Sequence, residues 1–241
     1  MSLLGVVRKI LRKMGIDLVR YSYLTHPIAR KMYFVEKTNI NIVLDVGANK
    51  GQYAYELRQV GYSNKIISFE PLSEAYAVLE RQAHKDVGWS TFNIALGDQD
   101  GLVDINISQN SQSSSLLNMH QKHSDAAPES KYYDKEQVTI KRLDSIIEDI
   151  SSVNDRIYLK IDAQGFEKQV LSGAKESFDR VEMIQIESAL VPLYEGETLF
   201  FEMNAFLYEC GYYLVSIDPP AFIEPVTGEL LQIDAIYRKV R

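Results

Sequence analysis

The chain has 241 residues, which is enough for one substantial domain with extensions and a sizeable hydrophobic core. Hydrophobic residues make up 46% of it and charged residues 24%, as in soluble globular proteins, and no apolar run approaches the length needed to span a membrane. The single cysteine, Cys210, excludes an internal disulfide and is typical of a reducing compartment. We therefore expect a cytoplasmic protein.

Charge is distributed unevenly along the chain. Residues 1–37 carry eight basic and two acidic side chains, so this segment has a net charge of +6. The whole chain has a net charge of −7, so residues 38–241 have a net charge of −13. A domain this acidic repels polyanions, which argues against nucleic acid as the partner.

The first fourteen residues have the pattern of a basic amphipathic helix, and its apolar face contains Leu3, Val6 or Val7, Ile10 and Met14. Basic residues interleave with the apolar ones, which is not the layout of a secretory signal. Two interpretations are open. The helix packs on the domain or on a second subunit of an oligomer, or residues 1–20 make weak contact with an anionic membrane surface, on its inner face.

The remaining chain alternates between strand and helix patterns, and we divide it into a helical extension over residues 1–38 and one domain over residues 39–241. Strands are predicted at residues 41–46, 65–69, 90–95, 102–107, 138–141, 156–161, 181–186, 212–217 and 232–238. Helices are predicted at residues 52–60, 73–84, from 144, after 166, and at 199–210.

This alternation predicts an α/β, Rossmann-like fold with a mostly parallel seven-stranded sheet covered on both faces. The short connection at residues 218–231 makes the last strand a reversed hairpin strand, because a parallel crossover needs more chain. Methyltransferases that use S-adenosylmethionine, the class I fold, share this plan.

Residues 108–136 interrupt the alternation with a polar, serine-rich stretch. We expect a lid or a disordered loop here, in which Tyr132 and Tyr133 line a substrate or are simply solvated. His120 and His123 have the spacing of a metal pair only if a carboxylate joins them, so no metal site is predicted.

The first predicted strand ends in a short acid and glycine motif that is typical of a nucleotide site. Asp45 is followed by Gly47, which lets the backbone pass close under a ligand, and by Gly51, which opens a helix whose free N–H groups favour an anion. The second strand ends in Glu70, placed to accept hydrogen bonds from both hydroxyls of a ribose. The alternative is an ordinary turn in which the glycines bind nothing.

The spacing within this loop bears on which nucleotide binds. Neither the dinucleotide pattern G-x-G-x-x-G nor a phosphate-binding Gly-Lys-Ser/Thr loop is present between Gly47 and Gln52. A cofactor with a ribose and no phosphate fits better, and S-adenosyl-L-methionine is such a cofactor, with its methionine carboxylate near the glycine turn.

An acidic residue lies near the end of each of five predicted sheet strands. They are Asp45, Glu70, Asp98, Asp162 and Glu187. Methyl transfer to a hydroxyl requires an aligned nucleophile and a base. Asp162 is the predicted base, Glu187 is the next candidate, and Lys160 lies on the same side of its strand as Asp162 and steers either carboxylate. The alternative is that Asp162 caps the following helix.

Four motifs resemble the FkbM family of methyltransferases over roughly residues 40–218. They are Leu44-Asp-Val-Gly-Ala-Asn-Lys-Gly51, Phe69-Glu-Pro71, Ile94-Ala-Leu-Gly-Asp98 and Leu159-Lys-Ile-Asp-Ala-Gln-Gly-Phe-Glu167, the last followed by Val170-Leu-Ser-Gly-Ala174. The resemblance implies O-methylation of a hydroxyl, often on a sugar, a glycan or a secondary metabolite, and places Asp98 near the adenine. The family usually has an acid where this chain has Gln164, a departure that bears on any metal site there. Cofactor contacts are predicted for Asp45, Gly47, Asn49, Gly51, Glu70, Pro71, Ala95 and Asp98.

Other functions compete with this one. Asp162 and Glu187 suit a metal-assisted O-methyltransferase, and a non-catalytic nucleoside-binding module and an NAD-dependent sugar enzyme are further alternatives. The segment Asp218-Pro-Pro-Ala-Phe222 resembles a loop of amino-methyltransferases that act on nucleic acid, although it follows the wrong predicted strand. The preferred acceptor is a small molecule or a glycan.

Overall fold

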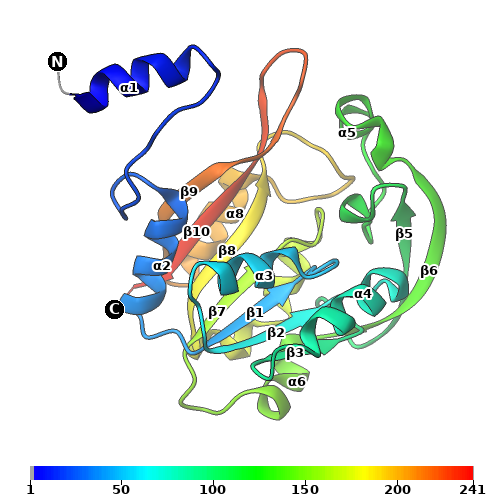
Figure 1. Ribbon diagram of the computed structural model, residues 1–241. Coiled ribbons are helices and arrows are strands. Elements are labelled where there is room, and N and C mark those ends of the chain that lie inside the picture. The colour runs from blue at the N-terminus through cyan, green and yellow to red at the C-terminus, as the bar shows by residue number, and fades with distance from the viewer. Residues whose placement is uncertain (1–2, 241) are drawn as a thin grey trace.

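The computed structural model describes residues 3–240 and consists of a large twisted sheet with a smaller sheet beside it (Figure 1). The large sheet has seven strands in the order β3-β2-β1-β7-β8-β10-β9. Their bounds are β1 Ile42–Val46, β2 Lys65–Phe69, β3 Trp89–Phe92, β7 Ile157–Ile161, β8 Val181–Ala189, β9 Tyr212–Ile223 and β10 Leu230–Lys239.

Strand directions confirm the predicted α/β class and the reversed hairpin strand. The pairs from β3 to β8 are all parallel, whereas β10 is antiparallel to both β8 and β9. The carboxyl ends of β1, β2, β7 and β8 therefore meet along one edge, which is where ligands bind in open α/β sheets.

Helices cover both faces of the large sheet because its central strands are apolar on both sides. In β1, Val43 packs toward one layer and Leu44 toward the other. One layer contains α2 (Pro27–Lys37), α3 (Gln52–Gln59) and α4 (Ser73–Ala83), and the other contains α6 (Leu143–Ile150), α7 (Glu167–Ser172), η3 (Lys175–Asp179) and α8 (Phe200–Glu209).

The region after the third predicted strand differs from expectation. The strand at 90–95 ends at Phe92, and Ala95–Leu96 forms β4 of a separate three-stranded sheet with β5 (Gly101–Ser108) and β6 (Tyr132–Lys141). β6 begins six residues before the predicted strand because residues 132–137 are two tyrosines followed by four polar residues, none of them fully buried, which leaves no alternation to read.

Residues 108–136 form ordered short elements rather than a disordered loop. They include η1 (Ser111–Ser113), α5 (Gln121–Ala126) and η2 (Pro128–Ser130). The Ser115 hydroxyl donates to the carbonyl of Gln164 at 2.6 Å, which connects this segment to the end of β7. The position is that of a lid over the edge of the large sheet.

The segment at residues 218–222, which resembles a loop of amino-methyltransferases that act on nucleic acid, is part of a strand. The backbone of residues 218–222 continues β9, which is six residues longer than predicted at its carboxyl end. This segment therefore does not follow the fourth strand of a methyltransferase sheet, in agreement with the order of the predicted strands. The side chains of residues 219–221 lie outside the described part of the structure.

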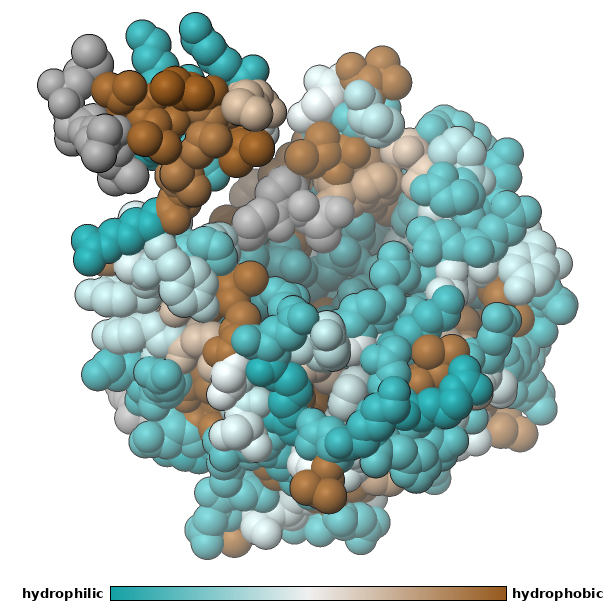
Figure 2. Space-filling model, viewed as in Figure 1, coloured by the Kyte–Doolittle hydropathy of each residue, from teal (hydrophilic) through white to brown (hydrophobic). Residues whose placement is uncertain are grey.

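The N-terminal helix, α1 (Leu3–Arg12), extends away from the sheet (Figures 1 and 2). The side chain of Leu3, one residue of its predicted apolar face, lies outside the described part, but Ile10 and Met14 are 58% and 68% exposed. In contrast, α2 packs on the large sheet through Val35. No helix within residues 3–240 is long and apolar enough to cross a membrane.

Candidate active site

A cavity of about 400 Å³ opens at the carboxyl ends of β1, β2, β7 and β8, between the large sheet and the small one. Its size is in the range of small-molecule sites. It includes eight of the predicted site residues: Gly47, Asn49, Glu70, Pro71, Ala95, Lys160, Asp162 and Glu187. Leu72, Ile94, Ile105 and Leu116 give its far end apolar walls.

The turn after β1 requires glycine because it lies against the next strand of the sheet. Gly47 has φ +74°, and a Cβ added there would be 1.8 Å from the carbonyl oxygen of Asp162. Asn49 also adopts a left-handed conformation, and its side chain donates to Ser111 of the lid segment at 3.1 Å. The turn therefore joins β1, β7 and the lid segment into one cavity wall.

Glu70 is held by backbone groups at the end of β2. Its Oε2 accepts from the backbone N–H of Asn49 at 2.8 Å, and its Oε1 accepts from that of Leu72 at 2.9 Å. Each carboxylate oxygen can accept more than one hydrogen bond, so both keep capacity for a ligand. Burial raises the pKa of Glu70 to about 7, despite these two hydrogen bonds.

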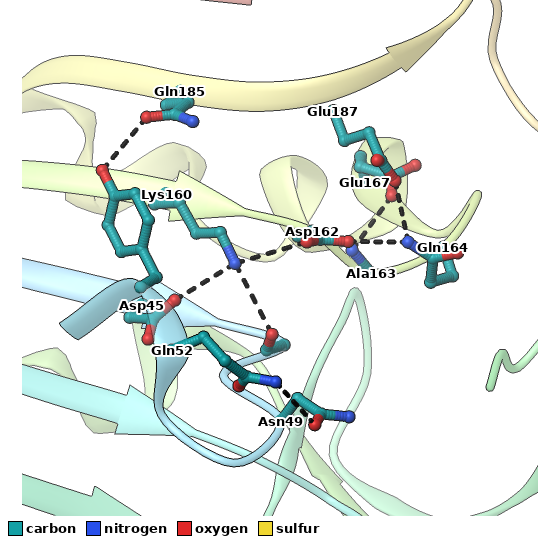
Figure 3. A network of polar contacts seen from close by, with 12 residues as sticks. Asp45, Asn49, Gln52, Lys160, Asp162, Ala163, Gln164, Glu167, Gln185 and Glu187 are labelled. Atoms are coloured by element: carbon teal, nitrogen blue, oxygen red, sulfur yellow. Dashed lines mark hydrogen bonds and ion pairs between the residues drawn. The ribbon is translucent and has the colours of Figure 1, made fainter. Parts of the chain in front are cut away.

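Lys160 links the first and fourth strands of the parallel set (Figure 3). Its Nζ lies 3.2 Å from Asp45 Oδ1 and 3.5 Å from Asp162 Oδ2. Burial opposes the charge, but these carboxylates outweigh it and raise the pKa of Lys160, so the ammonium stays charged. Asp45 is fully buried beneath the cavity and neutralises this ammonium, which is a supporting role.

Gln164 connects the two candidate bases through one amide nitrogen (Figure 3). Its Nε2 donates to Asp162 Oδ1 at 2.7 Å and to Glu187 Oε2 at 2.8 Å. Its Oε1 accepts from the hydroxyl of Tyr194 at 2.7 Å, which fixes the orientation of the amide. Gln164 adopts a left-handed φ of +53°. Where the family pattern has an acid, this chain has a donor between two carboxylates.

Further acidic groups surround this pair. Burial raises the pKa of Glu187 well above its ordinary value, and Asp162 adds to the effect. Glu167, whose Oε1 accepts from the backbone N–H groups of Ala163 and Gly165, has its pKa raised to about 8 by burial. Glu187 and Glu167 therefore keep their protons at pH values at which isolated carboxyl groups are ionised.

Three predicted cofactor residues do not line the cavity. Asp45 lies beneath it, as described above. Gly51 begins α3, and a Cβ there would be 2.7 Å from the Trp89 ring, so its glycine serves packing. Asp98 is exposed and lies outside the cavity walls, because its predicted sheet strand is β4 of the small sheet and turns it away. The placement of Asp98 near the adenine stays a prediction.

Sequence reasoning did not single out several polar cavity residues, among them Gln185, Tyr53, Glu56 and Asp234. Gln185 lies in β8, two residues before Glu187. Asp234 lies in β10 and is paired with Glu187 across the two strands. Polar residues in otherwise buried strands are a usable signal, since each needs a polar partner. Which groups they meet depends on strand pairing that short motifs do not reveal.

The two histidines of the lid segment are structural. The ring of His120 accepts from the backbone N–H of Lys122 at the start of α5, and His123 packs against Tyr194 and Phe222. Burial lowers the pKa of His123 to about 4. Within residues 3–240, no three His, Cys, Asp or Glu side chains gather in a metal-binding arrangement.

Comparison with known proteins then identifies the family. The family model of the methyltransferase FkbM domain matches residues 45–214. The chain belongs to the FkbM methyltransferase family. Residues 45–214 therefore form a methyltransferase domain, as the motifs predicted. No curated protein matches this chain.

The fold agrees with that of a solved FkbM methyltransferase. The FkbM methyltransferase of Methylobacillus flagellatus KT matches with a TM-score of 0.51 at 14% identity, over 83% of this chain and 43% of its own length. A putative S-adenosylmethionine-dependent methyltransferase from Listeria monocytogenes has a TM-score of 0.47 at 9% identity, over 89% and 100% of the two chains. This FkbM chain thus spans less than half the length of the Methylobacillus protein.

The cavity fits the cofactor of this family on its own evidence. Glu70 is a buried carboxylate with free acceptor capacity, and Gly47 keeps the turn beside it free of a side chain. Leu72, Ile94 and Ala95 supply an apolar wall of the kind that a purine base needs.

Proposed function

We propose that this FkbM protein methylates a hydroxyl group of a sugar, a glycan or a secondary metabolite. The observation that carries the proposal is the pair of carboxylates, Asp162 and Glu187, joined by Gln164 at one end of a cavity whose other end contains Glu70. A hydroxyl nucleophile must lose a proton, and this end of the cavity supplies proton acceptors.

In this proposal the cofactor is held along the carboxyl ends of β1 and β2. Glu70 accepts from the ribose hydroxyls, Gly47 and Asn49 border the methionine end, and Pro71 and Ala95 border the base. S-adenosylmethionine supplies an electrophilic methyl group with its own leaving group. The chain therefore needs only to orient the acceptor and to take its proton.

Asp162 is the proposed base. Gln164 and Lys160 fix its two oxygens from opposite sides, at 2.7 and 3.5 Å, so the carboxylate is oriented before an acceptor arrives. Glu187 accepts from Gln164 and from Gln232, the latter at 3.2 Å, and its raised pKa suits a group that holds the proton afterwards. Lys160 keeps the local charge balanced during the transfer.

The experiment is a screen of hydroxylated acceptors for a mass gain of one methyl group in the presence of S-adenosylmethionine. With an accepted substrate, Asp162→Asn should lower kcat by about 10²-fold or more and leave calorimetric binding of S-adenosylhomocysteine unchanged. Asp104→Asn, which changes an exposed carboxylate of β5, is the matched control and should retain full turnover. Unchanged turnover of Asp162→Asn would make Asp162 structural.

A metal-assisted reaction is not favoured over this one. The bridge between Asp162 and Glu187 is an amide N–H donor, and a metal ion needs a lone pair from that position. Activity that disappears in excess EDTA and returns with Mg²⁺ would reverse this preference.

We also propose that residues 1–20 contact an anionic membrane surface. The apolar side of α1 and the segment after it is exposed, with Val6, Ile10 and Met14 on it, and the same segment is rich in basic residues (Figure 2). Co-sedimentation with phosphatidylglycerol vesicles should fall when Ile10→Glu is introduced. Val226→Glu, at the exposed hairpin tip between Glu224 and Glu229, is the matched control and should pellet like the wild type.

A further inference from the structure

A second cavity of about 390 Å³ adjoins the active-site cavity on the side of α2. The two cavities share Tyr53, Glu56, Gln185 and Asp234 as wall residues. The shared wall lies next to Glu187, away from the Glu70 end. The second cavity, called the side cavity below, therefore extends the end of the active site where the acceptor must bind.

Three carboxylates stand side by side across the strands at this border. Asp234 of β10 is paired in register with Glu187 of β8 on one side and with Asp218 of β9 on the other. Glu187 is bound by Gln164 and Gln232, and Asp218 lies 3.3 Å from the Nζ of Lys31. The side-chain carboxylate of Asp234 accepts no hydrogen bond from any residue in the described part of the chain, and it lines both cavities.

Gln185 presents hydrogen-bond donors at the same border. Its Oε1 accepts from the hydroxyls of Tyr158 at 2.6 Å and Tyr53 at 3.0 Å, which fixes the amide plane. The residue is only 3% exposed, yet its Nε2 has no acceptor among residues 3–240. Because Gln185 lines both cavities, this N–H group is available to a ligand that accepts a hydrogen bond.

The outer wall comes from the N-terminal segment. Lys31 of α2, which pairs with Asp218, and His26 at the start of α2 both line the side cavity. The Nδ1 atom of His26 is buried and has no hydrogen-bond partner within the described residues. His26, Lys31, Asp218 and Asp234 all lie outside residues 45–214, which match the family model.

We propose that the side cavity binds the body of an uncharged, polyhydroxylated acceptor, such as a pyranose ring, while the hydroxyl to be methylated reaches Asp162. This inference rests on the proposed function and assigns the acceptor subsite to Gln185, Asp234, Glu56 and the α2 wall.

The chemistry of the wall selects this class. Asp234 and Glu56 only accept hydrogen bonds, whereas Gln185 Nε2 only donates, and a hydroxyl group can satisfy both kinds of partner. An anionic acceptor would face Asp234 and Glu56, with Lys31 already paired with Asp218. An ammonium group would leave Gln185 without an acceptor.

The test uses the full chain saturated with S-adenosylhomocysteine and ligand-observed saturation-transfer NMR. The probes are methyl glycosides of glucose, galactose, mannose and rhamnose, with glucuronate and glucosamine as charged counterparts. At least one uncharged glycoside should bind, with a Kd of about 1 mM. Asp234→Leu and Gln185→Glu should each weaken it about tenfold or more, while Asp104→Asn should not change it. Gln185→Glu keeps the acceptor for both tyrosine hydroxyls, so folding is preserved.

The outcomes separate this inference from the proposed function. Calorimetry of S-adenosylhomocysteine reports on the Glu70 end alone, and failure there would overturn both. If the cofactor product binds but no uncharged glycoside does, or if glucuronate or glucosamine binds better, the side cavity is not a polyol site. Equal affinity in the wild type and in both variants would overturn the assignment of Gln185 and Asp234.

Discussion

The two ends of the active-site cavity hold their carboxylates in different ways. Glu70 is bound by backbone N–H groups of Asn49 and Leu72, both close to it along the turns after β1 and β2. Glu187 is bound by side-chain amides of Gln164 and Gln232, which come from the end of β7 and from β10. The first end is built from local backbone geometry, and the second from long-range pairing of strands.

This difference indicates which end of the cavity is more sensitive to side-chain substitution. Backbone N–H groups do not change with side-chain substitution, so the Glu70 end is suited to a cofactor that stays the same. Side-chain amides can be replaced one at a time, so the Glu187 end is suited to acceptors that differ between relatives. Substitutions at the two ends should then separate cofactor binding from stability and acceptor chemistry.

The largest effect on stability is expected for a substitution of Gly47, where the turn after β1 lies against Asp162. Gly47→Ala places a Cβ 1.8 Å from the carbonyl of Asp162, and the strain should lower the free energy of unfolding by about 4 kcal/mol or more, measured by urea denaturation. Gly196 has nearly the same φ, +76°, but open space around it. Gly196→Ala should therefore cost only about 1–2 kcal/mol. Equal losses would show that φ alone matters.

Gln164→Glu should have the next largest effect, because it replaces a donor with a third carboxylate. Loss of two hydrogen bonds to charged groups should destabilise the fold by about 2–3 kcal/mol at pH 8. The introduced acid has a folded pKa above its unfolded value, so its penalty is absent at low pH and grows as pH rises through the folded pKa. Thermal unfolding at pH 6 and pH 8 measures this. Gln137→Glu, at an exposed position of β6, is the control, and a pH-independent loss would contradict the argument.

Glu70→Gln should weaken S-adenosylhomocysteine binding by about tenfold at pH 8, a smaller effect than the two above. The ligand's ribose needs the ionised carboxylate, and the pKa of Glu70 is raised to about 7 by burial. Wild-type affinity should therefore fall as pH drops below about 7, while the variant should lose this dependence. Calorimetry from pH 5.5 to pH 8, in about half-unit steps, checks both statements. A pH-dependent variant would mean that another group titrates.

The smallest effect is expected for Asp98→Asn. Asp98 is exposed and outside the cavity, so the affinity for S-adenosylhomocysteine should change by less than about twofold. A larger loss would return Asp98 to the cofactor site and would mean that the small sheet moves when the cofactor binds.

The sequence predicts the Glu70 end of the cavity better than the Glu187 end, for a physical reason. Gly47, Asn49 and Glu70 act through turns within a short stretch of chain, so their spacing carries the geometry. Gln185 and Asp234 meet only because β10 inserts between β8 and β9, an arrangement that depends on pairing across the whole domain. The small sheet was missed because β6 starts with two tyrosines followed by four polar residues, a run that shows no two-residue alternation.

Asp162 and Glu187 were found as individual candidates, but their connection through Gln164 was not. A glutamine after a strand has no single expected partner, and its left-handed φ is unusual for that residue type. The departure from the family's acid at this position was visible in the sequence. What it does could be read only from the positions of the three side chains.

Asp234 lies in the middle of a reversed strand, so in our proposal the register of the hairpin decides whether its carboxylate faces the acceptor. Side chains alternate between the two faces of a strand, so a one-residue insertion at 231–233 that moved the rest of β10 along its partners would bury Asp234 on the opposite face and present an aliphatic neighbour instead. Insertions at the exposed turn of residues 224–229 would leave that alternation intact. Hairpin length and substrate choice can consequently evolve independently, provided that changes accumulate at the tip rather than at the base.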